Sequence, residues 1–150
     1  MSQIRVTKEF SFEMSHALEA YDGPCRNIHG HSYRLFVTVI GQPVNDDANP
    51  ENGMVIDFGK LKKIVNKVII DRYDHAFVIR HTEDNFGVMI HVKKHFDKVE
   101  TVDYQPTCEN MVSRFAEDIM KELPENVALY SLKLHETATS YAEWYASDNL

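Results

Sequence analysis

The sequence predicts an α+β domain in which antiparallel strands pair and carry helices on one face. Four segments alternate or concentrate apolar side chains as strands do: 4–14, 32–40, 127–135 and 137–144. Two segments between these pairs, 58–70 and 107–123, carry apolar residues at helical spacing instead. With 150 residues and 43% hydrophobic composition the chain can bury a core, and its length favours one domain over residues 1–150.

The first quarter of the chain predicts two strands joined by a turn-rich loop. Residues 4–14 alternate polar and apolar side chains, and we expect an irregularity near Thr7 and Lys8. The run from Tyr21 to Pro24 has turn chemistry, which places Cys25 on a loop. Residues 32–40 are rich in aromatic and β-branched side chains and predict a largely buried strand, which a polar loop over 41–53 leaves.

The middle of the chain predicts a long helix and three shorter elements. Asp57 is a suitable N-cap for a helix that runs to about Ile70, with its lysines on the solvent side. A short strand follows and ends at Ile79, residues 82–96 suggest a short helix, and residues 99–104 suggest another strand. His91 and His95 are i,i+4 neighbours on that helix and are interpreted as surface histidines.

The last third predicts a second long helix and a closing pair of strands. Thr107 can cap the helix and Pro124 stops it. The following strand alternates, and its apolar face consists of Ala128, Tyr130, Leu132 and Leu134. Residues 137–144 form the final, aromatic-rich strand, and the open edges of such a sheet favour oligomerisation.

Composition and charge exclude several classes of protein. A net charge of −7 argues against a nucleic-acid-binding surface, because phosphates would meet repulsion. No apolar run approaches the roughly 20 residues that a membrane span needs, and the N-terminus lacks the features of a secretion signal. Two cysteines, Cys25 and Cys108, are too few for a disulfide framework. We therefore expect a cytoplasmic protein with free thiols.

Three histidines close in sequence predict a metal site. His29 and His31 project from one face if a strand begins there, and a neighbouring strand can carry His16 opposite them. Three imidazoles with an open fourth position are typical of catalytic zinc, although imidazole also suits copper, iron and nickel. Cys25 lies close enough either to bind the ion or to sit beside it as a thiolate.

Two acidic positions stay open from local sequence alone. Asp74 and His75 have the chemistry of a proton-transfer pair, but neighbours on a strand point opposite ways, so an uncoupled loop pair is favoured. Glu136 ends a strand, where a carboxylate can grip a ligand but is usually just solvated.

Six motifs in order resemble the family of 6-pyruvoyl- and 6-carboxy-tetrahydropterin synthases over nearly the whole chain. They are Phe12–His16, Cys25 with His29–His31, Val55–Phe58, Tyr73–His75, Pro106–Asn110 and His135–Thr137. The three residues between Cys25 and His29 resemble the bacterial 6-carboxy enzymes. The resemblance implies the T-fold, in which three subunits close into a β-barrel with helices outside, two trimers stack into a homohexamer, and active sites lie at subunit interfaces.

The resemblance also implies roles for individual residues. It implies that His16, His29 and His31 bind Zn²⁺, and that Cys25 is the catalytic thiol. It implies that Asp74 and His75 relay protons, contributed from a neighbouring subunit, which overrules the local interpretation. Glu136 resembles the anchor of the pterin ring, because a carboxylate can accept two parallel hydrogen bonds from an N–C–N edge. Ring contacts are further implied for Thr107 and Cys108, and Glu109 is either a ligand contact or a charge at the start of the helix. Arg26 is a candidate for the triphosphate or simply an exposed loop arginine.

The implied reaction converts 7,8-dihydroneopterin triphosphate into 6-carboxy-5,6,7,8-tetrahydropterin, acetaldehyde and triphosphate, an early step toward the 7-deazaguanine base of queuosine. One alternative is a 6-pyruvoyl-tetrahydropterin synthase, which releases triphosphate and keeps the side chain. Another is a noncatalytic zinc-binding protein on the same fold. A zinc hydrolase ranks last, because no glutamate is obviously placed to activate water.

Overall fold

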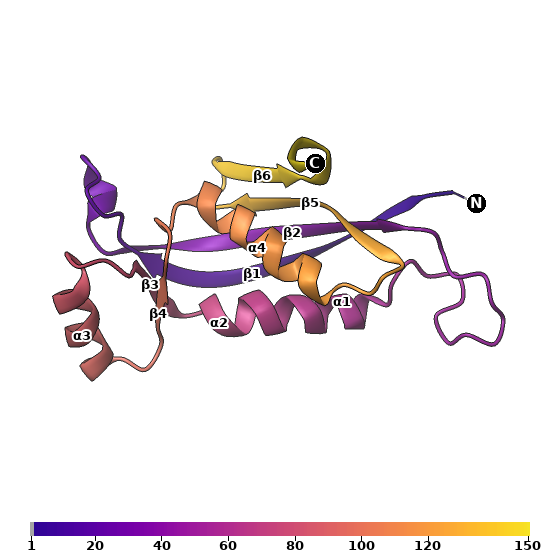
Figure 1. The fold of residues 1–150 in the computed structure, drawn as a ribbon, viewed down its shortest axis with the longest axis horizontal. Helices are drawn as coiled ribbons and strands as arrows, with labels where there is room; N and C mark the ends of the chain where they lie inside the picture. The colour runs from indigo at the N-terminus through magenta and orange to yellow at the C-terminus, as the bar shows by residue number, and fades with distance from the viewer. Residues whose placement is uncertain (1) are drawn as a thin grey trace.

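The computed structural model describes residues 2–150 as a six-stranded mixed sheet with helices (Figure 1). The sheet order is β4-β3-β1-β2-β5-β6. The strands are β1 (Ile4–His16), β2 (His29–Gly41), β3 (Ala76–Arg80), β4 (Val99–Val102), β5 (Val127–His135) and β6 (Tyr141–Tyr145). The helical segments are η1 (Pro24–Arg26), α1 (Phe58–Val65), η2 (Asn66–Ile70), α2 (Asp71–Tyr73), α3 (Phe86–His95), α4 (Cys108–Glu122) and η3 (Ala146–Asn149). The predicted α+β class is confirmed.

The hairpin of β1 and β2 is the long axis of the molecule (Figure 1). The two strands pair antiparallel without interruption from Ile4 opposite Gly41 to His16 opposite His29. The irregularity expected near Thr7 and Lys8 was therefore wrong. Two further pairings were not foreseen: β3 lies parallel to the end of β1, and β4 lies parallel to β3.

The irregularity of the sheet lies instead between β2 and β5. Thr38 pairs with Ser131 but Val39 pairs with Leu129, so Tyr130 is an extra residue on β5. Such a bulge reverses which side chains face inward. For this reason the apolar face expected for β5 was right at Leu132 and Leu134, which are buried, and wrong at Ala128 and Tyr130. Val127 and Leu129 are the buried residues in that part of the strand.

The helical run from α1 to α2 follows from its N-cap and from the spacing of its buried side chains. The Asp57 carboxylate accepts hydrogen bonds from the amides of Gly59 and Lys60, as the N-cap prediction requires. The buried residues then recur every four positions: Leu61, Val65, Ile69 and Tyr73. A four-residue spacing drifts by about 40° per step on an ideal α-helix, and the wider π-helical turn η2 counteracts that drift. The helical run thus continues past Ile70 to Tyr73.

The remaining elements agree with the sequence except at the end of the chain. The Thr107 hydroxyl accepts from the amide of Asn110 and caps α4. The final strand was expected over 137–144, but a turn occupies the segment between Glu136 and Ser140, and the strand runs from Tyr141 to Tyr145. None of the described helices has the length and apolar character that crossing a membrane requires.

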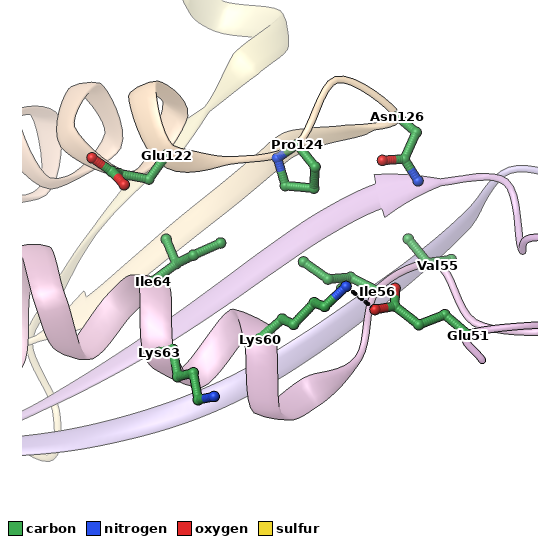
Figure 2. Close-up of a pocket in the computed structure, with 9 residues that line it drawn as sticks. All are labelled: Glu51, Val55, Ile56, Lys60, Lys63, Ile64, Glu122, Pro124 and Asn126. Atoms are coloured by element: carbon green, nitrogen blue, oxygen red, sulfur yellow. Dashed lines mark ion pairs between the residues drawn. The ribbon is translucent and has the colours of Figure 1, made fainter. Parts of the chain in front are cut away.

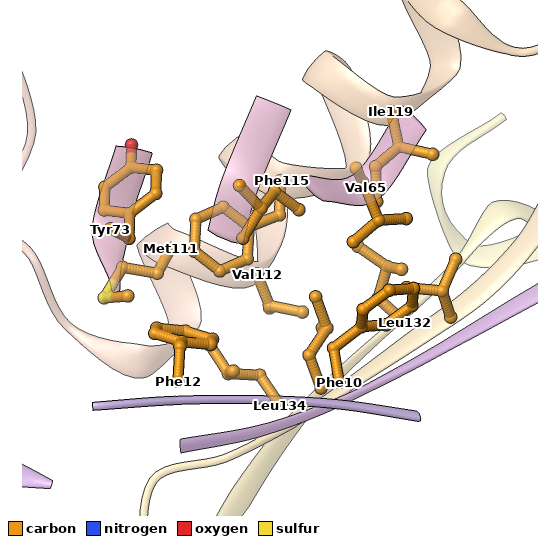
Figure 3. Packing of buried hydrophobic residues seen from close by; sticks show 14 of the residues in the cluster. Phe10, Phe12, Val65, Tyr73, Met111, Val112, Phe115, Ile119, Leu132 and Leu134 are labelled. Atoms are coloured by element: carbon orange, nitrogen blue, oxygen red, sulfur yellow. The ribbon is translucent and has the colours of Figure 1, made fainter. Parts of the chain in front are cut away.

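The helices α1 and α4 cover one face of the sheet and enclose the main core (Figure 1). Side chains from β1 and β5 meet side chains from α1, α2 and α4 in this layer, as Figure 3 shows. Among them are Phe10, Phe12, Leu132 and Leu134 from the sheet, and Val65, Tyr73, Met111, Phe115 and Ile119 from the helices. The other face of β1 presents exposed polar side chains, so the two faces of the hairpin have opposite character.

Candidate metal centre and surrounding site

Three histidines gather where β1 ends and β2 begins. His16 and His29 are cross-strand partners, and His31 lies two residues further along β2 on the same, helix-covered face. Their ring centroids are 4.6, 4.9 and 5.3 Å apart. One nitrogen of each ring lies within 4.8 Å of the corresponding nitrogens of the other two. The convergence expected from the sequence is thus present.

Backbone carbonyls orient two of these rings. Nδ1 of His16 lies 2.7 Å from the Pro106 carbonyl oxygen, and Nδ1 of His29 lies 2.7 Å from the Asn27 carbonyl oxygen. Because a carbonyl oxygen can only accept, each Nδ1 carries the proton and each Nε2 presents a lone pair. The two Nε2 atoms lie 3.1 Å apart, close to the separation of about 3.3 Å expected for two nitrogens on a tetrahedral zinc. Two facing lone pairs at this distance fit a shared cation.

Burial favours the neutral form of two imidazoles of the cluster, His16 and His31. Burial lowers the pKa of His16 from 6.5 to about 4, and the neighbouring His29 and His31 lower it further. Burial also lowers the pKa of His31, although the Glu136 carboxylate opposes this effect. His31 Nε2 is buried and has no hydrogen-bond partner within residues 2–150. Neutral nitrogens without partners are what a metal ligand set needs, so these residues fit a divalent cation.

Cys25 is not one of the converging donors. It sits in η1, in the loop where the sequence placed it, and is half-buried. Its sulfur is not among the donor atoms that converge within 4.8 Å, which favours a separate thiol over a ligand. The Cys25 carbonyl accepts a hydrogen bond from the amide of Leu18 at 3.0 Å. The loop therefore folds back onto the residues that directly follow His16.

A glutamine that the sequence analysis missed ties this loop to the start of α4. The side-chain amide of Gln105 accepts from the Glu19 amide at 3.2 Å and donates to the Glu19 carbonyl at 2.7 Å. The next residue, Pro106, supplies the carbonyl that orients His16. No sequence signal identifies this glutamine, because the contact joins residues 86 positions apart.

Asp74 and His75 are coupled, contrary to the interpretation from local sequence. Nδ1 of His75 lies 3.0 Å from Oδ1 of Asp74. The pair precedes β3, and the left-handed backbone of His75, with φ of 61°, turns the two side chains toward each other. Burial of Asp74 tends to raise its pKa, but the hydrogen bonds from the Glu13 amide and His75, with the charge of Lys98, lower it overall.

This pair lies on the other side of the sheet from the three histidines. His75 lines a cavity of about 310 Å³, which His31 also borders, together with Glu13, Ser15 and Ser32. Those three residues alternate with Met14, His16 and His31 along β1 and β2, so their side chains point to the open face. Within one chain the Asp74–His75 pair therefore lies on the open face, and of the three clustered histidines only His31 borders the same cavity.

The predicted ring-binding residues lie around the helix-covered side of the centre. Glu136 follows β5 directly, and its Oε1 lies 3.7 Å from Nε2 of both His16 and His31. The Cys108 thiol donates to the Leu134 carbonyl at 3.2 Å, and burial raises its pKa to about 11, so it is a thiol rather than a thiolate. Thr107 caps α4, and Glu109 is exposed on its first turn.

A cavity at the opposite end of the hairpin contains none of the predicted site residues. It measures about 390 Å³ and lies between α1 and the segment that follows α4 (Figure 2). Lys60 and Glu51 form an ion pair at its mouth. It adjoins Gly41, twelve residues along β2 from His29, or about 40 Å at the rise of a strand.

Comparisons with known proteins converge on one family. A family model described as 6-pyruvoyl tetrahydropterin synthase matches residues 5–147. A protein of Haemophilus influenzae named 6-carboxy-5,6,7,8-tetrahydropterin synthase is 38% identical over 141 residues, covering 93% of this chain and 97% of that protein. An Aquifex aeolicus protein of the same name is 30% identical over 161 residues, covering 93% and 96%.

Solved structures share the fold. An uncharacterized protein from Wolinella succinogenes superimposes with a TM-score of 0.81 at 20% identity, covering 97% of this chain and 99% of that one. The 6-pyruvoyl tetrahydropterin synthase of Caenorhabditis elegans gives a TM-score of 0.68 at 23% identity, covering 97% of each chain.

Proposed function

The chain belongs to the 6-pyruvoyl tetrahydropterin synthase family, and from this premise we propose that it is a zinc-dependent 6-carboxy-5,6,7,8-tetrahydropterin synthase. In this proposal it converts 7,8-dihydroneopterin triphosphate into 6-carboxy-tetrahydropterin, acetaldehyde and triphosphate, on the route to queuosine. The observation that carries the proposal is the convergence of three imidazoles, two of which have their Nδ1 atoms held by backbone carbonyls. The names of the relatives support the choice of product.

The metal would be held by His16, His29 and His31. A zinc ion bound there would supply Lewis-acid chemistry, acidifying the C–H bonds next to the side-chain oxygens of the substrate. The helix-covered face excludes water from this side of the centre, because His16 is almost fully buried.

The chain's own groups would recognise the ring and move protons. Glu136 accepts two hydrogen bonds from the N–C–N edge of the pterin, assisted by the start of α4 at Thr107, Cys108 and Glu109. The Cys25 thiolate takes or returns a proton on one side of the substrate side chain. Nε2 of His75 does so on the other, while Asp74 holds Nδ1.

The position of Asp74 and His75 on the open face supports an active site shared between subunits. In this arrangement one chain supplies the three histidines and Glu136, and a neighbouring chain supplies the proton-relay pair. A homohexamer built from two trimers, as in the T-fold, would provide such neighbours.

The deciding experiment incubates zinc-loaded protein with dihydroneopterin triphosphate and analyses the products by mass spectrometry. Acetaldehyde with 6-carboxy-tetrahydropterin is expected. Release of triphosphate alone would identify a 6-pyruvoyl synthase instead. Bound zinc with no turnover would leave only a noncatalytic zinc-binding protein.

The Cys25→Ala variant tests the assignment of the thiol. It should keep the metal and the oligomer but lose activity on the order of a hundredfold or more, the range of a single proton-transfer group. Metal analysis, size-exclusion chromatography and the acetaldehyde assay measure the three properties. Activity like that of the wild type in this variant would refute the role.

A further inference from the structure

The hydroxyl of Tyr33 is an unexplained buried polar group next to the candidate metal centre. Tyr33 is fully buried, and its hydroxyl oxygen has no hydrogen-bond partner within residues 2–150. Buried tyrosine hydroxyls usually find a partner, since an unmade hydrogen bond costs roughly 1–3 kcal/mol. The buried Tyr73 and its neighbour Tyr104 show the usual solution, with hydroxyls 3.1 Å apart. The exception at Tyr33 therefore points to a role in the site.

The ring of Tyr33 is fixed, so its hydroxyl cannot swing toward another partner. It stacks on Phe12 with centroids 5.0 Å apart and planes 6° from parallel. The edges of His31 and His16 meet it at 5.6 and 6.3 Å. The strand, the stacked ring and two of the proposed metal ligands thus set the direction of the hydroxyl.

That direction leads to Glu136. Arg34 pairs with His135, and continuing this antiparallel register places Tyr33 opposite Glu136 on the helix-covered face. A tyrosine hydroxyl carries an O–H donor and an ionised carboxylate only accepts, so a hydrogen bond between the two runs from Tyr33 to Glu136. A carboxylate has about four acceptor positions, so one oxygen can accept from Tyr33 while both still face the two donors of a ring edge.

We propose that Tyr33 is a positioning residue that donates its hydroxyl hydrogen to Glu136 and holds this carboxylate toward the N–C–N edge of the substrate ring. The inference rests on the proposed function, in which Glu136 anchors a pterin. Without ligand, Oε1 of Glu136 leans toward Nε2 of His16 and of His31 at 3.7 Å from each. At 3.7 Å neither nitrogen makes a hydrogen bond with the carboxylate, and Tyr33 supplies a donor when the ring binds.

The Tyr33→Phe variant separates this role from a packing role. It keeps the aromatic stack and removes only the hydroxyl. The expected result is an unchanged or higher melting temperature, because an unpartnered buried group is lost, together with full zinc content. KM should rise about tenfold or more, with a smaller change in kcat, as expected for a lost hydrogen bond to a charged group.

Tyr104→Phe is the matched control. It also deletes a tyrosine hydroxyl, but one that makes its hydrogen bond within the protein. It should lower the melting temperature and leave KM unchanged. A Tyr33→Phe protein with wild-type KM, or with a stability loss like that of the control, would overturn the proposal.

A double-mutant cycle with Glu136→Gln shows whether Tyr33 acts through Glu136. Binding is measured with neopterin, whose ring fluorescence reports the complex without any turnover. Tyr33→Phe should weaken binding about tenfold in the wild type and change it little in Glu136→Gln. Equal losses in both backgrounds, or a wild type that does not bind neopterin, would contradict the inference. Binding without turnover would instead contradict the proposed reaction and leave this test valid.

Discussion

The two faces of the β1–β2 hairpin carry different parts of the proposed site. The helix-covered face holds His16, His29 and His31, whose rings are packed together and partly oriented by backbone carbonyls. The open face holds the Asp74–His75 pair, and the side chain of His75 is 77% exposed. In the proposed function the first face binds a metal ion and a ring, and the second presents a proton-transfer group outward.

The two faces differ in what covers them within one chain. Alternation along a strand sends His16 and Ser15 to opposite faces, and His75 shares a cavity with Ser15 and not with His16. The covered face is complete within the chain because helices close it. In the proposed function the open face is completed by a surface from a neighbouring subunit.

Removing one of the clustered histidines should give the largest effect. His31→Ala should lose the metal and all measurable activity, because a three-nitrogen site becomes a two-nitrogen site. His95→Ala removes an exposed histidine on α3, outside the cluster, and should alter neither property. Elemental analysis of the purified variants measures metal per chain, and full occupancy in His31→Ala would contradict the ligand assignment.

Subunit complementation tests the separation of the two faces directly. His75→Ala should lose activity on the order of a hundredfold or more while keeping its metal. Co-assembled with His31→Ala, it should recover about a quarter of the wild-type activity, because random mixing pairs an intact covered face with an intact open face at one site in four. If the mixture is no more active than its components, the site does not span two subunits.

The covered face was largely predictable from the sequence and the open face was not. Alternation places His16, His29 and His31 on one side of a hairpin, so spacing alone indicated the cluster. Alternation does not apply to Asp74 and His75, because the φ of 61° at His75 is not that of a strand. The resemblance to a family recovered them where periodicity could not.

Two other features depend on contacts distant in sequence. The extra residue at Tyr130 reverses the inward face of β5 without interrupting its apolar pattern, so the sequence gives no sign of the bulge. Tyr33 shares the face of His31, which alternation predicts. The missing partner of its hydroxyl, and the position of Glu136 opposite it, depend on the pairing of β2 with β5.

As the pH falls, protonation of His16 on the covered face should destabilise the metal-free protein before protonation of Asp74 on the open face does. Burial lowers the pKa of His16 from 6.5 to about 4, so the unfolded chain binds its proton at higher pH than the folded chain. The stabilisation is complete above about pH 6.5 and is lost as pH falls toward 4, by about 3 kcal/mol. Asp74 on the open face has a pKa lowered from 3.8, so its contribution is lost only in stronger acid.

Urea unfolding of chelator-treated protein between pH 7 and 4.5 measures this effect. The free energy of unfolding should fall over the whole interval. The zinc-loaded protein should fall more steeply, because protons also displace the metal. A flat profile between pH 7 and 5 would mean that His16 is not held neutral by burial.

The smallest expected effect concerns the loop that carries Cys25 on the covered side. Gln105→Ala removes both side-chain hydrogen bonds to the Glu19 backbone, at a cost of about 1–3 kcal/mol. Because His16 keeps its bond to the Pro106 carbonyl, the metal content should hold while the loop opens more often. Alkylation of Cys25 by iodoacetamide should become about tenfold faster.

Cys108 serves as an internal reference in that experiment, since its buried thiol, with a pKa raised to about 11, should stay unreactive in every variant. Gln42→Ala, at an exposed position outside this contact, is the matched control and should leave the Cys25 rate unchanged. Loss of metal together with faster alkylation would mean that Gln105 supports the whole centre. An unchanged rate would mean that the bond between Leu18 and Cys25 holds the loop alone, and that the covered face orders its thiol without help from α4.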